Sequence, residues 1–193
     1  MEKNFEGMTS DELNNFLQTH RIPIEQWGMG EAKSVQDLLL EIERGETTFV
    51  EMQGELFRHV KVLNLAIIHV ADDGMIYRLY EDHQKFSDGR IRTRKRMLGT
   101  AVSEKMLIHE EPEQALQRAL KEELQINSLY GIDTMQTVTE TKESSSYPGL
   151  KTKYDFYVGT VTLSKGDYSP EGYSEFEEST GITTELKWKR ESD

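Results

Sequence analysis

The stretch of sequence that decides the fold covers residues 110–126 and reads EEPEQALQRALKEELQI. Its apolar residues recur at helical spacing, and Pro112 falls in the first turn, where a missing amide costs nothing. The pattern predicts one amphipathic helix over residues 110–124. Glu122 and Glu123 lie at the edge of its apolar face, and paired carboxylates suit a hard cation such as Mg²⁺. The alternative is an ordinary acidic helix that ends in solvated carboxylates.

Strand patterns flank this helix on both sides. Before it, apolar and alternating runs predict strands at residues 47–52, 56–71 and 75–80, followed by a charged segment at 83–96. Asp72-Asp73-Gly74 is a strong hairpin turn between the second and third strands. The strands predicted after the helix cover residues 132–141, 152–163 and 182–189, and the acidic residues 171–178 are expected in a loop before the last strand. Strands on both sides of one helix indicate an α/β (α+β) fold.

Residues 1–46 read as a helical extension in front of this pattern. Thr9 with Glu12, and Ser34 with Asp37, have the spacing of capping boxes, which predicts one helix after each pair. Trp27 is expected to pin the extension to the rest of the chain. The sequence therefore predicts an N-terminal extension at 1–46 and a domain at 47–193.

The order of residues in 110–126 resembles the Nudix box, whose pattern is G-x5-E-x7-R-E-U-x-E-E-x-G-U, with U an aliphatic residue. The matching positions are Glu110, Arg118, Leu120, Glu122, Glu123 and Ile126. The resemblance covers roughly residues 60–190. It implies a Nudix-like mixed β-sheet that carries the box helix.

Three positions depart from the Nudix pattern. Glu104 stands in place of the opening glycine, Ala119 in place of the glutamate after arginine, and Gln125 in place of the closing glycine. In the family, the box glutamates hold Mg²⁺ against a pyrophosphate, and the glutamate after arginine binds metal or acts as a general base. Ala119 can do neither. The box is therefore degenerate.

The resemblance implies roles for the residues that remain. Glu122 and Glu123 are the expected ligands of Mg²⁺ or Mn²⁺, Arg118 an orienting residue, and Glu110 an assisting carboxylate. Glu140, on the strand after the helix, is a candidate replacement for the carboxylate that is missing at Ala119.

Four arginines lie just upstream of the box, at Arg90, Arg92, Arg94 and Arg96. In an extended segment a period of two places them on one side, where guanidinium groups match phosphate oxygens. They are candidate substrate-binding residues for a diphosphate or a nucleic-acid backbone. The alternatives are a solvated edge strand whose charges prevent edge pairing, or arginines that form ion pairs with the many acidic residues.

Two other features leave alternatives open. His69 lies in an apolar strand and is expected to be a core or hydrogen-bonded histidine rather than a ligand. The loop at residues 144–149 is rich in hydroxyl groups and holds Tyr147. It either shapes a substrate pocket or stacks a base, or it is an ordinary turn.

The composition excludes several classes of function. The formal net charge is −12, from 35 acidic and 23 basic residues, so general nucleic-acid binding is disfavoured and only a local basic patch could support it. The chain has no cysteine, which excludes disulfides and thiolate sites. No apolar run approaches the length of a membrane helix, and the first residues lack the pattern of a signal peptide. We expect a cytoplasmic protein with no membrane partner.

Two functions follow. One is a Mg²⁺-dependent hydrolase of a nucleoside-diphosphate-linked compound, with weak or altered activity. The other is an inactive Nudix-fold module that binds a nucleotide, an RNA end or a protein partner. The sequence leaves open which of the two is correct.

Overall fold

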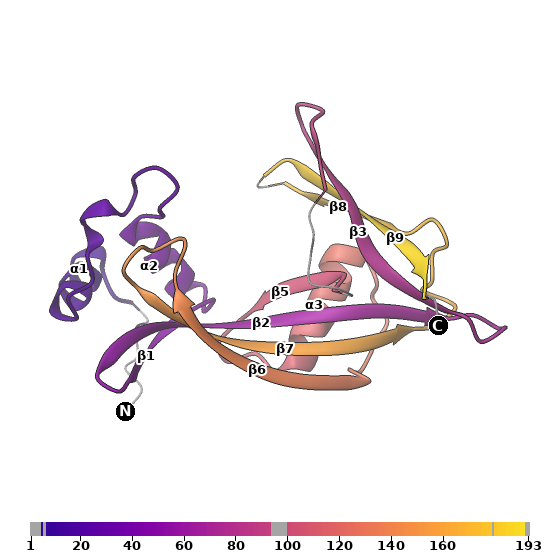
Figure 1. Ribbon diagram of the computed structural model, residues 1–193, viewed down its shortest axis with the longest axis horizontal. Helices are drawn as coiled ribbons and strands as arrows, with labels where there is room; N and C mark the ends of the chain where they lie inside the picture. Colours follow the sequence, from indigo (N-terminus) through magenta and orange to yellow (C-terminus); the bar gives the residue numbers. More distant parts are fainter. Residues whose placement is uncertain (1–4, 6, 94–99, 179, 192–193) are drawn as a thin grey trace. The chain divides into compact units, whose positions relative to one another are not determined.

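The computed structural model describes residues 5, 7–93, 100–178 and 180–191 (Figure 1). Its α-helices are Ser10–Thr19 (α1), Val35–Glu43 (α2) and Pro112–Leu124 (α3), and a 3-10 turn covers Ile24–Gln26 (η1). The strands are Thr48–Met52 (β1), Glu55–Val70 (β2), Ile76–Phe86 (β3), Ile91–Arg92 (β4), Val102–Met106 (β5), Thr134–Glu143 (β6), Lys151–Leu163 (β7), Tyr173–Glu177 (β8) and Ile182–Arg190 (β9). This combination of helices and a sheet confirms the α+β class.

The described residues form two compact units, each treated by itself. Unit 1 contains those within 1–62, 105–110 and 137–156, and unit 2 contains those within 63–104, 111–136 and 157–193. In the described part of the chain, no helix is both long and apolar enough to cross a membrane. The division into an extension at 1–46 and a domain at 47–193 stays a prediction.

The two helices of unit 1 begin at the predicted capping boxes. The Thr9 hydroxyl accepts a hydrogen bond from the backbone amide of Glu12, and the Glu12 carboxylate accepts one from the amide of Thr9 at 2.8 Å. Ser34 and Asp37 form the same pair of hydrogen bonds before α2. Antiparallel β1 and β2 pair beside them. The core of the unit consists of Phe5, Leu13, Leu17, Trp27, Leu38, Leu39, Ile42, Phe49, Leu56, Tyr147 and Leu150.

Trp27 connects the N-terminal segment to the loop between β6 and β7. Its indole nitrogen donates to the Pro148 carbonyl at 2.9 Å, and its ring lies 5.0 Å from that of Tyr147. Tyr147 is fully buried. The ring of Tyr147 therefore belongs to the core of unit 1 and does not stack a base. Gly149 of the same loop lines a pocket with residues of unit 1, so the pocket interpretation of the loop stays a prediction.

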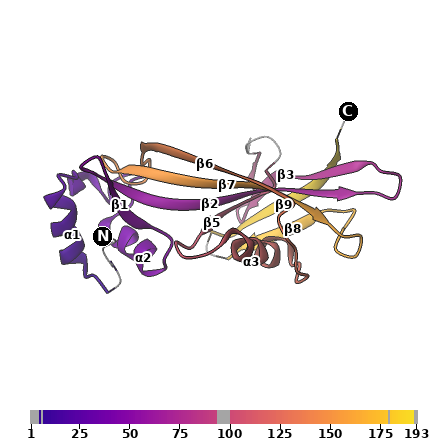
Figure 2. The ribbon, with the colours of Figure 1, turned by 90° about the horizontal axis from the view of Figure 1, so that it is seen from below.

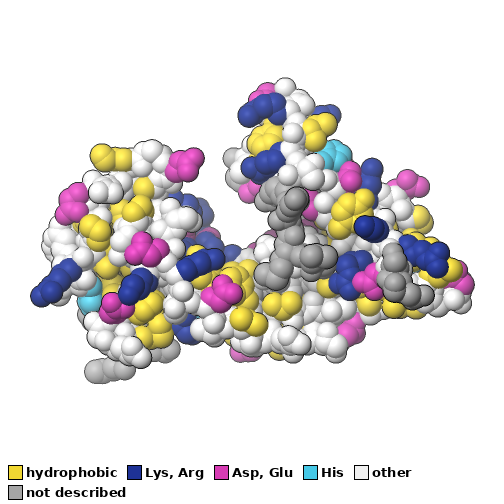
Figure 3. All heavy atoms as spheres, viewed as in Figure 1, with side chains coloured by type: hydrophobic (Ala, Val, Ile, Leu, Met, Phe, Trp, Pro, Cys, Tyr) yellow, Lys and Arg dark blue, Asp and Glu magenta, His cyan; other side chains and the backbone are white. Residues whose placement is uncertain are grey.

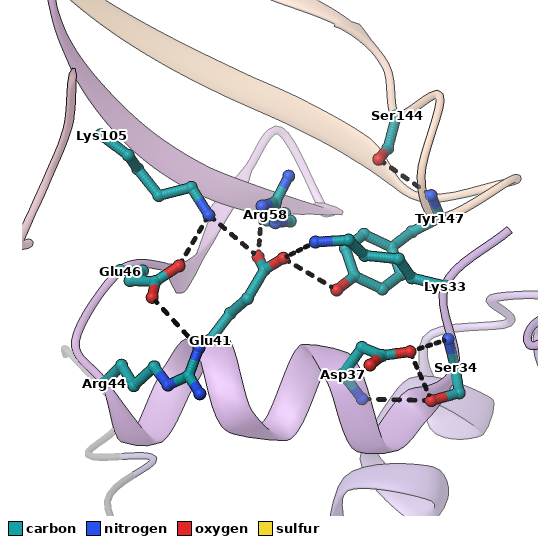
Figure 4. Close-up of polar contacts among 10 residues, drawn as sticks. All are labelled: Lys33, Ser34, Asp37, Glu41, Arg44, Glu46, Arg58, Lys105, Ser144 and Tyr147. Carbon is teal, nitrogen blue, oxygen red and sulfur yellow. Dashed lines mark hydrogen bonds and ion pairs between the residues drawn. The ribbon is translucent and has the colours of Figure 1, made fainter. Parts of the chain in front are cut away.

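A buried carboxylate organises the polar side of this core (Figure 4). Glu41, on α2, accepts hydrogen bonds from Lys33 at 2.7 Å, Arg58 at 2.5 Å and the Tyr147 hydroxyl at 3.1 Å. Lys105 lies 3.6 Å away. Burial raises the pKa of Glu41, but the hydrogen bond from Lys33 and the charges of Arg58 and Lys105 outweigh it and lower the pKa to about 2. Glu41 therefore stays ionised in the core.

In unit 2, four strands pair in the order β4-β3-β9-β8, and β3, β9 and β8 lie side by side in Figure 1. A bulge between Glu81 and His83 shifts the β3–β9 register. Leu79 and Leu186 are buried on one face of this sheet, and α3 packs against β8 (Figure 2). His69 is buried, hydrogen-bonded to the Leu163 carbonyl and stacked on Tyr168, which confirms the expectation of a core histidine.

Two segments of unit 2 contain strand beyond the predicted strand bounds, and the first agrees with the edge-strand alternative. The charged segment at 83–96 begins as strand, because β3 continues to Phe86 and turns into β4. The acidic segment at 171–178, expected as a loop, contains β8. The end of β3 and the whole of β8 are extended because they pair with β9, and β4 is extended because it pairs with β3.

Candidate functional site

The box helix α3 forms as its sequence dictates. The amide of Glu111 donates to Gln114 at 3.0 Å, and Pro112 occupies the first turn. Its apolar face is buried, as expected, and includes Ala115, Leu116, Ala119 and Leu120. The helix therefore presents one face to the unit 2 core and leaves its acidic edge near the C-terminal end.

The two adjacent glutamates of the box do not share a face. The Glu122 side chain is 60% exposed, whereas Glu123 is buried, as expected for neighbours that lie about 100° apart on a helix. The residue that shares the face of Glu123, one turn earlier, is the fully buried Ala119. On that face only one of the two carboxylates that the Nudix pattern would supply is present.

Arg118 joins α3 to β5. Its guanidinium forms an ion pair with Glu104, and a second nitrogen–oxygen contact of 3.8 Å reaches Glu122. Glu104 occupies the position of the opening glycine in the Nudix pattern. The sequence did not predict this pairing, because 14 residues and a change of element separate the two side chains. Both acidic side chains next to Arg118 therefore share its positive charge.

Glu110 stabilises the turn in which it lies. Its carboxylate accepts the amide of Leu107 at 2.9 Å, and the side chain is buried. Lys61, on β2, donates to the backbone carbonyl of Glu110 at 2.7 Å. These contacts all lie within unit 1 and give Glu110 a structural role in this turn.

Glu140 lies on β6 and is exposed to solvent, as is every residue of that strand. It belongs to unit 1, whereas Glu122 and Glu123 belong to unit 2. Its proposed replacement of the missing carboxylate stays a prediction.

The described residues do not gather the ligands of a metal ion. No group of three or more His, Asp or Glu side chains within them is arranged to hold one. Mg²⁺ takes an octahedron of oxygen ligands, and α3 supplies the exposed carboxylate of Glu122 and the buried one of Glu123. The carboxylates of α3 by themselves therefore do not fit a resident Mg²⁺.

The arginines upstream of the box lie at the hairpin between β3 and β4. The guanidinium carbons of Arg90 and Arg92 lie 5.0 and 5.1 Å from the centre of the Phe86 ring. Arg90 also pairs with Asp88 at 2.6 Å, and Arg92 donates to Gln84 at 2.5 Å. Arg94 and Arg96 lie outside the described residues. The ring and its polar neighbours hold two guanidinium groups at one exposed strand end.

Gln125 ends α3 in the left-handed conformation, with φ of 58° and ψ of 25°. The closing glycine of the Nudix pattern suits this conformation because glycine has no Cβ to strain there. The backbone of the degenerate box therefore retains the turn that a glycine would make without strain.

We expect Gln125→Gly to stabilise the protein by about 1 kcal/mol, because it relieves this backbone strain. The measurement is urea unfolding followed by the fluorescence of Trp188, which lies in unit 2. Gln125→Ala, which keeps a Cβ, is the matched control and should give little gain. If Gln125→Gly and Gln125→Ala were equally stable, the backbone at residue 125 would not be strained by a Cβ.

The chain is similar to several solved structures, but no known family model and no curated protein matches it. The C. elegans Ap4A hydrolase aligns over 68% of this chain and 80% of its own, with 17% identity and a TM-score of 0.35. The E. coli ORF135 protein aligns over 67% and 72%, with 19% identity and a TM-score of 0.34. The M. smegmatis Nudix hydrolase RenU aligns over 74% and 79%, with 15% identity and a TM-score of 0.35. At TM-scores this low, the alignments carry no argument about function.

Proposed function

We propose that this chain is a Nudix-like module that binds a phosphate-bearing nucleotide and has lost hydrolytic activity. The observation that supports this most is the pairing of Ala119 with Glu123 on one buried face of α3. A carboxylate at the first position would complete the metal-binding pair of the family pattern. An alanine methyl group supplies neither a ligand nor a base.

The contacts of Arg118 support the same proposal. This arginine lies between Glu104 and Glu122, and its charge competes with any cation for their carboxylates. Glu104 also stands in place of a glycine, so a structural ion pair now links β5 to α3. The box helix would then serve as a structural element that connects β5 to the rest of unit 2.

The exposed hairpin supplies the groups that would bind phosphate. Arg90 and Arg92 flank Phe86 and project from a strand end, where a ligand can approach them. A guanidinium group can donate two parallel hydrogen bonds to phosphate oxygens. The present polar partners of these groups are Asp88 for Arg90 and Gln84 for Arg92, and a phosphate could replace both. Nucleotide binding would replace these contacts with stronger, charge-assisted ones.

We expect Arg90→Ala and Arg92→Ala each to weaken nucleotide binding by about 10- to 100-fold, the effect of losing a charge-assisted hydrogen bond. The measurement is isothermal titration calorimetry with nucleotide sugars, dinucleoside polyphosphates and nucleoside triphosphates. Arg44→Ala is the matched control, because Arg44 is also exposed and paired with a nearby acid, Glu46, at 3.8 Å. Equal losses in all three variants would contradict the assignment.

Loss of the reaction needs its own test. With millimolar Mg²⁺ or Mn²⁺, we expect no phosphate or nucleotide release from the same compounds. Metal-dependent release that disappears in the Glu122→Gln, Glu123→Gln double variant would overturn the proposal in favour of a hydrolase.

A further inference from the structure

The sheet β4-β3-β9-β8 of unit 2 has two chemically different faces. One is buried and carries Leu79 and Leu186. Cross-strand pairing and the alternation of side chains place a second set of residues on the opposite face, which we call the outer face. Its exposed members include Tyr80, Lys85, Ile91, Phe176, Lys187 and Lys189.

Large apolar side chains are unusually exposed on the outer face. Ile91 is 67% exposed and Phe176 is 63% exposed, at the two ends of one cross-strand row that also contains Lys85 and Thr183. Tyr80, nearer the other end of β3, is 36% exposed. Figure 3 shows hydrophobic and basic side chains next to one another, with acidic ones among them, in the region where Figure 1 draws β3. The solvent face of an antiparallel sheet is normally polar, so these rings require an explanation.

The charges of the outer face leave a positive excess. The carboxylate of Asp82 lies 2.9 Å from His83 and 3.7 Å from Lys187, and Glu185 accepts a hydrogen bond from Ser174 at 3.1 Å. Within the described residues, no carboxylate lies within ion-pair distance of Lys85 or Lys189. Asp82 therefore has ionic partners and Glu185 a neutral one, while Lys85 and Lys189 have no carboxylate partner among the described residues.

We propose that the outer face binds single-stranded nucleic acid, with bases stacked on Phe176 and Tyr80 and phosphates bound by Lys85, Lys187 and Lys189. Exposed aromatic rings and ammonium groups on one flat sheet are complementary to the two repeating parts of such a chain. A protein partner would favour a continuous apolar patch, but here charged residues separate the apolar ones along every strand.

This site goes beyond the proposed nucleotide binding, because different residues form it. Arg90 and Arg92 lie over Phe86, which pairs with Ile182 on β9. Phe176 pairs with the next residue of β9, Thr183. Because adjacent residues of a strand point to opposite faces, Phe86 and Phe176 lie on opposite faces of the sheet. The net charge of −12 opposes binding over the whole surface but permits it on a local cationic face. Duplexes hide the faces of their bases, so stacking restricts the ligand to single strands.

The test is fluorescence anisotropy of the full chain with labelled 12-nucleotide RNA and DNA, single-stranded and duplex, at several salt concentrations. We expect single strands to bind and duplexes to bind at least about tenfold more weakly, since stacking on exposed rings contributes strongly. Three phosphate contacts predict a log–log salt slope of about −2. Phe176→Ala should weaken binding about tenfold or more, and Lys85→Ala with Lys189→Ala should make the salt slope shallower.

Matched exposed residues of unit 2 provide the controls. Leu129, 88% exposed, controls for Phe176, and Lys165, whose side chain is 77% exposed, controls for Lys85. Leu129→Ala and Lys165→Ala should bind like the unmodified protein. No single-strand binding at low salt, equal binding of duplexes, or binding that survives Phe176→Ala would each overturn the outer-face site. The nucleotide titrations with Arg90→Ala and Arg92→Ala are read separately, so either proposal can fail alone.

Discussion

Replacing Glu41 with leucine is expected to destabilise unit 1 by about 3–5 kcal/mol, the usual effect of removing one member of a buried ion pair. The side chains of Lys33 and Lys105 are 48% and 32% exposed and can turn to water. Arg58, at 7% exposure, cannot. The variant therefore leaves a buried guanidinium without its carboxylate. Urea unfolding followed by the fluorescence of Trp27, in a Trp188→Phe background, measures the loss with a reporter that lies in unit 1.

A double variant distinguishes the cost of leaving the Arg58 charge unpaired from the cost of altered packing. Arg58 already has one buried nitrogen, Nε, without a hydrogen-bond partner among the described residues. We expect Glu41→Leu with Arg58→Met to recover about 1–3 kcal/mol relative to Glu41→Leu alone, because apolar replacement of both partners removes the unpaired charge. A double variant less stable than the single one would show that the guanidinium has another essential contact.

Acid unfolding provides an independent check on Glu41. Its pKa is 4.5 in an unfolded chain and about 2 in the folded protein, so its stabilisation is complete above about pH 4.5. That contribution, about 3 kcal/mol, is lost as the pH falls from 4.5 towards 2. Asp155 titrates in an overlapping range, because hydrogen bonds from Lys153, Thr139 and His59 overcome burial and lower its pKa to about 2. Glu41→Gln should therefore flatten the pH dependence, and Asp155→Asn should flatten it separately.

Replacing Gly172 with alanine is expected to cost unit 2 about 3 kcal/mol or more. A Cβ at this position would lie 1.9 Å from the carbonyl oxygen of Leu186, which is backbone and cannot rotate away. The residue also has φ of +89°, which L side chains rarely adopt. Because Tyr173 pairs with Leu186, the substitution must displace the start of β8 from β9.

Trp188 reports this change directly. Its indole donates to the Ser169 carbonyl at 2.7 Å, and its ring lies 6.2 Å from that of Tyr173. Urea unfolding of Gly172→Ala in a Trp27→Phe background should show a lower midpoint. Gly166→Ala is the control, since a Cβ there meets only the Ser164 hydroxyl, at 3.8 Å, and should change stability little. A normal midpoint for Gly172→Ala would contradict the close β8–β9 approach.

The features that the sequence predicted are those set by local contacts. Each capping box lies within four residues, and the apolar face of α3 repeats every turn, so both can be read without knowing the fold. The fold class followed from the order of these elements. The left-handed end of α3 at Gln125 also agrees with the position of a glycine in the pattern.

The features that it missed depend on distant partners. β8 carries acidic residues that predict a loop, and only its pairing with β9 makes it a strand. Glu104 and Arg118 attract each other across two elements. Glu41 did offer a clue, because it lies three residues after Leu38 on the apolar face of α2. A carboxylate at such a position indicates a buried partner, but not which residue it is.

The discontinuous composition of unit 1 has a consequence for the order in which the chain folds. The hydrogen bond from Trp27 to Pro148 joins residues 121 positions apart, and the hydrogen bond between Tyr147 and Glu41 joins residues 106 positions apart. During synthesis, α1 and α2 therefore emerge long before the residues that complete their core. Contacts this distant in sequence close slowly, because most of the chain entropy must be lost first. The apolar faces of the N-terminal helices then stay uncovered until the segment that contains Tyr147 and Pro148 has left the ribosome.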